Sequence, residues 1–87
     1  MKPTVGRIVH YHATSALTEE PITCAAIITR ADYAGGHDAL EREDSYEVDL
    51  HVFATDGSGG SGAQGVRYTP ARGAAAPINT WSWPPRD

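Results

Sequence analysis

The chain of 87 residues has room for one domain, which we place over residues 1–87, and its single cysteine excludes an internal disulfide. No stretch approaches the ~20 apolar residues that span a bilayer, and the amino-terminal segment lacks the apolar region of a signal peptide. We therefore expect a cytoplasmic protein with no membrane partner. The net charge of −4, with basic residues scattered along the chain, argues against DNA or RNA as a partner.

Glycine and proline divide the chain into short segments with strand-forming residues, a pattern typical of a small β fold. We expect strands at residues 5–12, 22–30, 46–55, 64–69 and 79–83. In the first, Val9 and Tyr11 should point one way and the histidines beside them the other. The second is apolar on both faces, which predicts a central strand. The third alternates most regularly, with Val48, Leu50 and Val52 on one face.

Two longer segments, residues 32–45 and 56–65, are predicted to be variable loops. The first is acidic, and the second is part of a glycine-rich run. Five short strands joined by loops of unequal length predict an all-β fold, a small five-stranded SH3-like barrel. An OB-like barrel is the alternative. Closing the sheet into a barrel would also remove the exposed edges of so small a sheet.

The most distinctive local feature is the pair Trp81 and Trp83 in the last expected strand. Alternation puts both indoles on one face. Tryptophan serves as a core residue, as an interface anchor or as a stacking platform for bases. We expect one of the two to close the barrel floor beneath Tyr11 and the other to line a pocket or an interface.

Histidine and arginine supply the other candidate ligand contacts. His10 and His12 share a face, and with His51 and Cys24 they could be considered as zinc ligands, but the spacing of a zinc motif is absent, so we expect no metal. Arginine can hold a phosphate with its two-pronged guanidinium, or it can simply be solvated. The candidate ligand-binding residues are Arg7, His10, Tyr11, His12, Arg67, Trp81 and Trp83.

No motif indicates catalysis or a bound cofactor. The glycine-rich run lacks the lysine and the following helix of a phosphate-binding loop. Serine, histidine and aspartate are all present, but no known arrangement of nucleophile, base and orienting group links them. We therefore expect a protein that is not an enzyme and that carries no cofactor.

Four blocks of the sequence carry a resemblance: VGRIVHY at residues 5–11, CAAIIT at residues 24–29, VDLHVF at residues 48–53 and TWSWP at residues 80–84. Their order and spacing resemble a group of short uncharacterised proteins encoded by tailed phages and actinobacterial prophages. The pairing of GRIVHY with TWxWP is the more specific part. The resemblance covers most of the chain outside the loops. It implies a phage context and brings no assigned activity.

Within that context we expect a homo-oligomeric sponge in the host cytoplasm that sequesters a nucleotide immune signal and so acts against host defence. Aromatic residues would stack on a base, Arg7 or Arg67 would meet a phosphate, and the histidines would bond the ribose or base edges. Self-association would supplement a thin core and build a pocket between subunits. The alternatives are an accessory or decoration protein of the virion, and an inhibitor that docks on a host protein.

Overall fold

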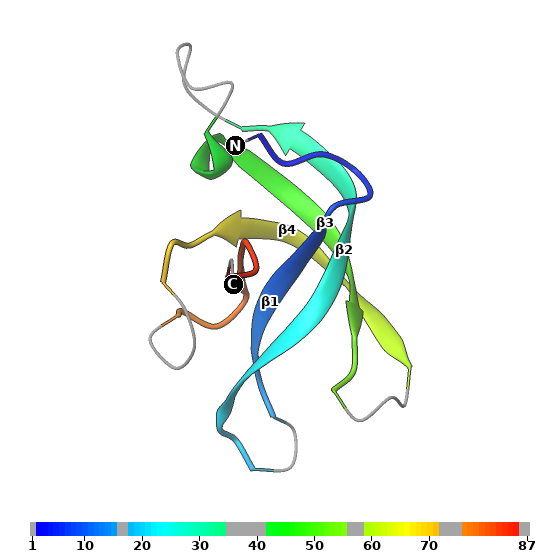
Figure 1. Cartoon of the computed structure of the whole chain (residues 1–87), viewed down its shortest axis with the longest axis vertical. Helices are drawn as coiled ribbons and strands as arrows, with labels where there is room; N and C mark the ends of the chain where they lie inside the picture. Colours follow the sequence, from blue (N-terminus) through cyan, green and yellow to red (C-terminus); the bar gives the residue numbers. More distant parts are fainter. Residues whose placement is uncertain (1, 16–17, 35–41, 56–58, 72–75, 86–87) are drawn as a thin grey trace.

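The computed structural model describes residues 2–15, 18–34, 42–55, 59–71 and 76–85. They form five strands and one 3-10 turn: β1 (Ile8–Thr14), β2 (Pro21–Tyr33), η1 (Glu43–Ser45), β3 (Tyr46–Phe53), β4 (Gly60–Tyr68) and β5 (Thr80–Ser82). Consecutive strands are hydrogen-bonded neighbours, and β5 returns to β1 to close a barrel (Figure 1). The expected all-β, five-stranded barrel is confirmed. Its strands follow chain order around the barrel, with β4 and β5 parallel and the other neighbouring strands antiparallel, which is consistent with a small SH3-like or OB-like barrel.

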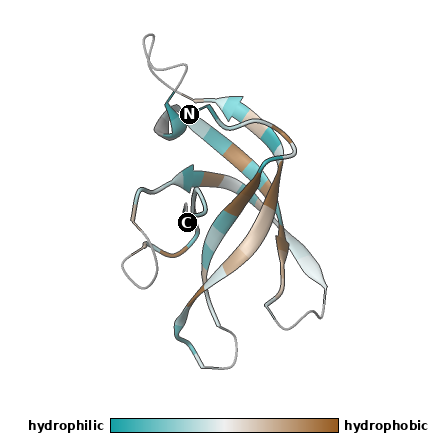
Figure 2. Ribbon diagram, in the orientation of Figure 1, coloured by the Kyte–Doolittle hydropathy of each residue, from teal (hydrophilic) through white to brown (hydrophobic). Residues whose placement is uncertain are grey.

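The barrel core comes from alternate residues of the strands. Along β3, hydrophobic and hydrophilic residues take turns (Figure 2), and the burial follows the same period of two. The largest fully buried apolar side chains from the strands are Val9, Ile28, Leu50, Val48, Val66 and Trp81. Removing each such side chain from water stabilises the fold by about 1.5–3 kcal/mol before the cost in conformational entropy.

Two β-bulges face one another across Asp49. In β2 the register shifts between Ile28 and Arg30, so Thr29 is the extra residue. In β4 the shift lies opposite Asp49, where Gly65 has a φ of 62° and donates its N–H to Asp49 Oδ1 at 3.1 Å. Bulges bend and twist a strand, which allows a small sheet to curl into a barrel.

The predicted limits of β2 and β4 were wrong. Beyond the bulge in β2, Ala31 packs against the core. The strand continues to Tyr33 and so includes the start of the predicted loop 32–45. The ring of Tyr33 meets Tyr46 edge-on, with centroids 5.6 Å apart. β4 begins at Gly60, so residues 60–65 are strand and not loop. The rest of the two predicted loops lies partly outside the described residues, at 35–41 and 56–58.

The bounds of β1, β3 and β5 also differ from expectation. β1 starts at residue 8 and runs to residue 14, β3 ends two residues early at Phe53, and β5 holds only three residues. β5 pairs antiparallel with β1 and parallel with β4. The described part of the chain contains no helix long and apolar enough to cross a membrane.

Candidate functional site

The two tryptophans lie on one face of the carboxy-terminal segment but in different surroundings. Trp81 is 0% exposed and is packed by the ring of Tyr68, whose centroid is 5.0 Å away. Trp83 is half-buried and meets Trp81 edge-on, with centroids 5.0 Å apart and an interplanar angle of 89°. Trp81 therefore offers no surface to a ligand in this structure. Trp83 is the indole that solvent reaches.

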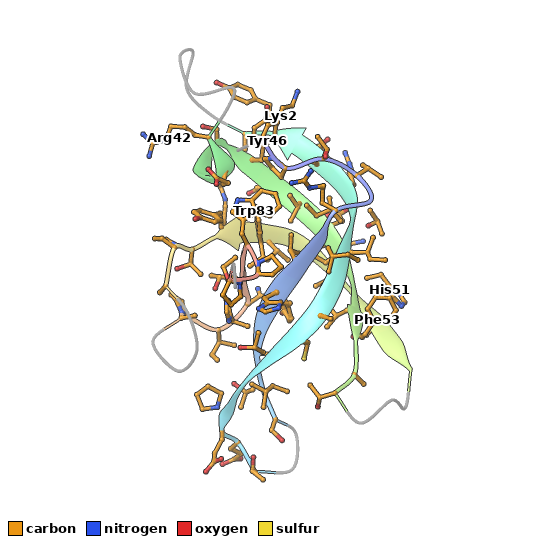
Figure 3. The ribbon with its side chains drawn as sticks, in the orientation of Figure 1. Lys2, Arg42, Tyr46, His51, Phe53 and Trp83 are labelled. Carbon is orange, nitrogen blue, oxygen red and sulfur yellow. The ribbon has the colours of Figure 1, made fainter. Side chains whose placement is uncertain are left out.

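Trp83 is fixed by a polar contact from η1. Its indole N–H donates a hydrogen bond to Glu43 Oε2 at 2.7 Å. The guanidinium carbon of Arg7 lies 5.3 Å from the centroid of the Trp83 ring, within the range of a cation–π contact. Figure 3 shows Trp83 below η1, in the end of the molecule that also carries Lys2, Arg42 and Tyr46. Three segments far apart in the sequence thus build one site around this ring.

The backbone of the amino-terminal segment places Arg7. Gly6 has a φ of 92°, a conformation that favours glycine, and its N–H donates to the Ile28 carbonyl at 2.8 Å. The Ile28 N–H in turn donates to the Arg7 carbonyl at 3.0 Å. This reciprocal pair ties the segment to β2 just before β1 begins. Arg7 therefore starts from an anchored backbone position although it is exposed.

Glu43 is the acidic member of this site. Burial raises the pKa of its carboxyl, but hydrogen bonds from its own backbone N–H and from Trp83 outweigh burial, so that the pKa is lowered from its ordinary value. A carboxylate that stays charged holds the indole N–H more firmly than a neutral acceptor would. Glu43 thus positions the ring without competing for its exposed surface.

His12 lies in a separate cluster of polar side chains, with Ser82 and Thr23. His12 is 2% exposed, and its Nε2 lies 2.8 Å from the hydroxyl of Ser82, which is 3% exposed. Its Nδ1 lies 3.5 Å from Thr23 Oγ1. Burial and then the nearby His10 lower the pKa of His12, which favours the neutral ring. Ser82, His12 and Thr23 are linked in the same way as a nucleophile, a base and an orienting group. However, Ser82 is buried, so a substrate does not reach its hydroxyl.

Two of the remaining candidates, Tyr11 and Arg67, have structural partners. The hydroxyl of Tyr11 donates to Asn79 Oδ1, and its pKa is raised by burial and by Cys24. Arg67 forms an ion pair with Glu47 across β3 and β4, at 3.0 Å. His10 is half-buried on the outer face of β1. The structure therefore brings Arg7 and Trp83 into contact and distributes the other sequence-predicted residues over the core, the polar cluster around His12, the outer face of β1 and the β3–β4 surface.

A cavity of about 410 Å³ is lined by residues of the β1–β2 and β3–β4 hairpins. Burial raises the pKa of the Cys24 thiol in its wall, which keeps that thiol protonated and unreactive. The cavity is lined by Tyr11, Ala13, Thr14, Cys24, Val52, Ala54, Gly59, Gly60 and Ser61.

Sequence reasoning missed Glu43, Ser82 and Asn79. Each acts through a contact with a residue at least 40 positions away in the chain. Glu43 also belongs to an acidic run in which no member stands out. A lone polar residue that meets its partner only after folding leaves no signal in local spacing.

Among the described residues, no group of three histidine, cysteine, aspartate or glutamate side chains is placed to hold a metal ion. Comparisons with family models, with curated proteins and with solved structures found no match to this chain.

Proposed function

We propose that this protein is a non-enzymatic binding module of the phage type, a sponge that holds a nucleotide signal at Trp83 and Arg7 without altering it. The observation that carries the proposal is the half-exposed indole of Trp83 with a guanidinium 5.3 Å from its centre. A base would stack on the indole in place of the guanidinium, at about 1–3 kcal/mol per base, and the displaced arginine would bind the phosphate through two parallel hydrogen bonds. Together they match the two halves of a nucleotide.

The surroundings of the ring support this reading. Glu43 fixes the indole from its N–H edge, so the ring face does not have to be ordered when a base arrives. Lys2 and Arg42 lie in the same end of the molecule (Figure 3) and add positive charge there, although the whole chain carries −4. Together with Arg7 these cations offset the negative charge of Glu43 beside the ring, which favours the approach of a small anion.

Native mass spectrometry with a panel of cyclic nucleotides and ADP-ribose-type compounds tests the proposal. We expect the protein to gain the mass of an intact nucleotide. Trp83→Leu removes the stacking ring and Arg7→Ala removes the guanidinium, and each should weaken binding at least tenfold. Trp83→Phe keeps a ring but loses the bond to Glu43, so its binding should fall between the parent and Trp83→Leu.

The matched control is Arg30→Ala. Arg30 is also exposed, lies on β2 away from the Trp83 ring, and pairs with Asp32 at 2.7 Å. Its removal changes the net charge by the same amount as Arg7→Ala and should leave nucleotide binding unchanged. If no nucleotide binds, or if Arg7→Ala and Trp83→Leu bind as tightly as the parent, the proposed site is wrong.

A protein partner is the second candidate, favoured by large apolar side chains at the surface. Val5 is 66% exposed, Ile8 is 52% exposed and Ile78 is 50% exposed. Exposed apolar side chains of this size can contribute contact area with another protein. A virion accessory protein would be found in purified phage particles, and a host-protein inhibitor would copurify with one defined host partner. Either result, combined with an absence of nucleotide binding, would favour a protein-binding role over the sponge.

A further inference from the structure

In the part of the chain that the structure describes, the first half of β4 pairs with a strand on one side only. β4 pairs with β3 from Gly60 onward, but only Arg67 and Tyr68 pair with β5. β5 is short because the chain enters it at Asn79, which has a φ of 66° and breaks the extended conformation before Thr80. Within the described residues, no strand therefore covers the edge of β4 over residues 60–65. Figure 1 shows this part of β4 in the β3–β4 hairpin, at the lower right.

The hydrogen-bond register shows which backbone groups face that edge. The Ala54 N–H donates to the Gly59 carbonyl at 2.8 Å, so these two residues form a hydrogen-bonded pair at the end of the hairpin. Bonded and non-bonded pairs alternate in an antiparallel ladder. Gly60 and Gly62, opposite Phe53 and His51, therefore fall in non-bonded pairs, and their N–H and C=O groups point away from β3.

This edge lacks the usual protection against pairing. Natural edge strands carry lysine, proline or a bulge that prevents another strand from adding. Residues 60–63 are Gly-Ser-Gly-Ala, without charge, and the bulge at Gly65 comes only after them. Small side chains also let a second strand approach closely. Because the sequence is short, uncharged and nearly uniform, it can pair antiparallel with itself about a two-fold axis without a steric or charge conflict.

The outer face beside this edge adds an apolar contact. The rings of His51 and Phe53 meet edge-on with centroids 5.0 Å apart, and Phe53 is 41% exposed. Beside these rings, β4 carries no side chains at Gly60 and Gly62. A second copy paired at this edge would cover part of the exposed Phe53 ring.

We propose that two copies of the chain associate through the β4 edge, residues 60–63, to form an antiparallel β3–β4–β4–β3 sheet across a two-fold axis. The paired surface is small compared with standard interfaces, so the dimer is weak and depends on concentration. The edge lies on a different part of the barrel from Trp83, and the proposal goes beyond nucleotide binding by naming the surface for self-association.

Analytical ultracentrifugation and amide hydrogen exchange of the full chain test the dimer. We expect a monomer–dimer equilibrium in which the Gly60 and Gly62 amides exchange more slowly as the protein concentration rises. Gly62→Pro removes a donor that does not serve the β3 ladder, so the barrel should fold and the dimer should weaken at least tenfold. Gly62→Ala keeps the N–H, and a Cβ there meets nothing within 4 Å, so this variant should still dimerise.

Three results would overturn the proposal: a protein that stays monomeric at millimolar concentration, a dimer whose Gly60 and Gly62 amides exchange as in the monomer, or Gly62→Pro dimerising like the parent. The exchange measurement on the parent decides the matter if Gly62→Pro does not fold. A monomer that binds nucleotide would contradict the β4 interface and support the Trp83 site. A dimer that binds no nucleotide would support the β4 interface and contradict the Trp83 site.

Discussion

His12 is a buried histidine whose neutral ring is favoured by its surroundings. Burial and the nearby His10 lower its pKa from the ordinary 6.5, while Ser82 and Thr23 are its hydrogen-bonding neighbours. The unfolded chain therefore takes up a proton near pH 6.5 while the folded chain resists it. Stability is full above 6.5 and is lost as the pH falls toward the lower pKa of the folded state.

We expect the free energy of unfolding of the parent to decrease between roughly pH 7.5 and pH 5, and that of His12→Gln to change much less. Urea titrations followed by circular dichroism measure both. His51→Gln is the control, because His51 is exposed, and it should keep the pH dependence of the parent. A parent whose stability is flat over this interval would show that His12 is not a buried neutral group.

The contribution of Glu43 to stability depends on its ionised form, whereas that of His12 depends on its neutral form. Its folded-state pKa is lowered from 4.5 because hydrogen bonds, including the one from Trp83, outweigh burial, so its contribution is present above that value and is lost as the pH falls below it. Glu43→Gln should reduce stability by about 1 kcal/mol at neutral pH and by much less near pH 3. Glu20→Gln, at an exposed position, should change little at either pH. Equal losses at both pH values would contradict a charged carboxylate at this contact.

At the scale of the strand, β4 shows why sequence patterns found some elements and missed others. β3 was predicted to begin at the residue where it begins, because its alternation of apolar and polar side chains reflects one buried face. The start of β4 was missed because glycine and serine give no such alternation, and its pairing depends on backbone hydrogen bonds. β2 was predicted too short because a bulge shifts the inward–outward alternation of its side chains by one residue. No local sequence pattern predicts that bulge.

Gly60 is a position where this strand has no room for a side chain. A Cβ there would lie 2.5 Å from the Val52 carbonyl oxygen and 2.6 Å from His51 Nε2. The ring could rotate away, but the backbone oxygen belongs to the β3–β4 ladder. Gly60→Ala should therefore destabilise the barrel by about 1–3 kcal/mol.

The control for Gly60→Ala is Gly62→Ala, two residues along the same strand, where a Cβ meets nothing within 4 Å. We expect its melting temperature to stay close to that of the parent. Thermal denaturation followed by circular dichroism compares the three proteins. If both variants melt together, the close approach of His51 and Val52 to Gly60 is not present in solution.

At the scale of the whole molecule, the barrel is closed by a strand of three residues, and Trp81 at its centre is fully buried. Sequence analysis placed two tryptophans on one face but could not assign their depth, because depth depends on where β5 docks between β1 and β4. The expected closure is present, yet the brevity of β5 leaves the free edge on β4 that a complete closing strand would have covered. Fold class was thus predictable from local patterns, whereas the site and the free edge follow from how the last strand docks.

Trp81 should therefore control folding, and Trp83 should control binding. Replacing a buried Trp by Ala costs about 3–5 kcal/mol, while a domain of this length has a total stability of roughly 4–13 kcal/mol. Trp81→Ala should lower the melting temperature by more than about 12 °C or abolish the cooperative transition. Trp83→Leu, at the half-exposed rim, should retain a cooperative transition much closer to that of the parent. If β5 closes the barrel, losing its large buried side chain must disturb the packing of β1 and β4. A Trp81→Ala protein that melts within a few degrees of the parent would therefore show that β5 does not close the barrel in solution.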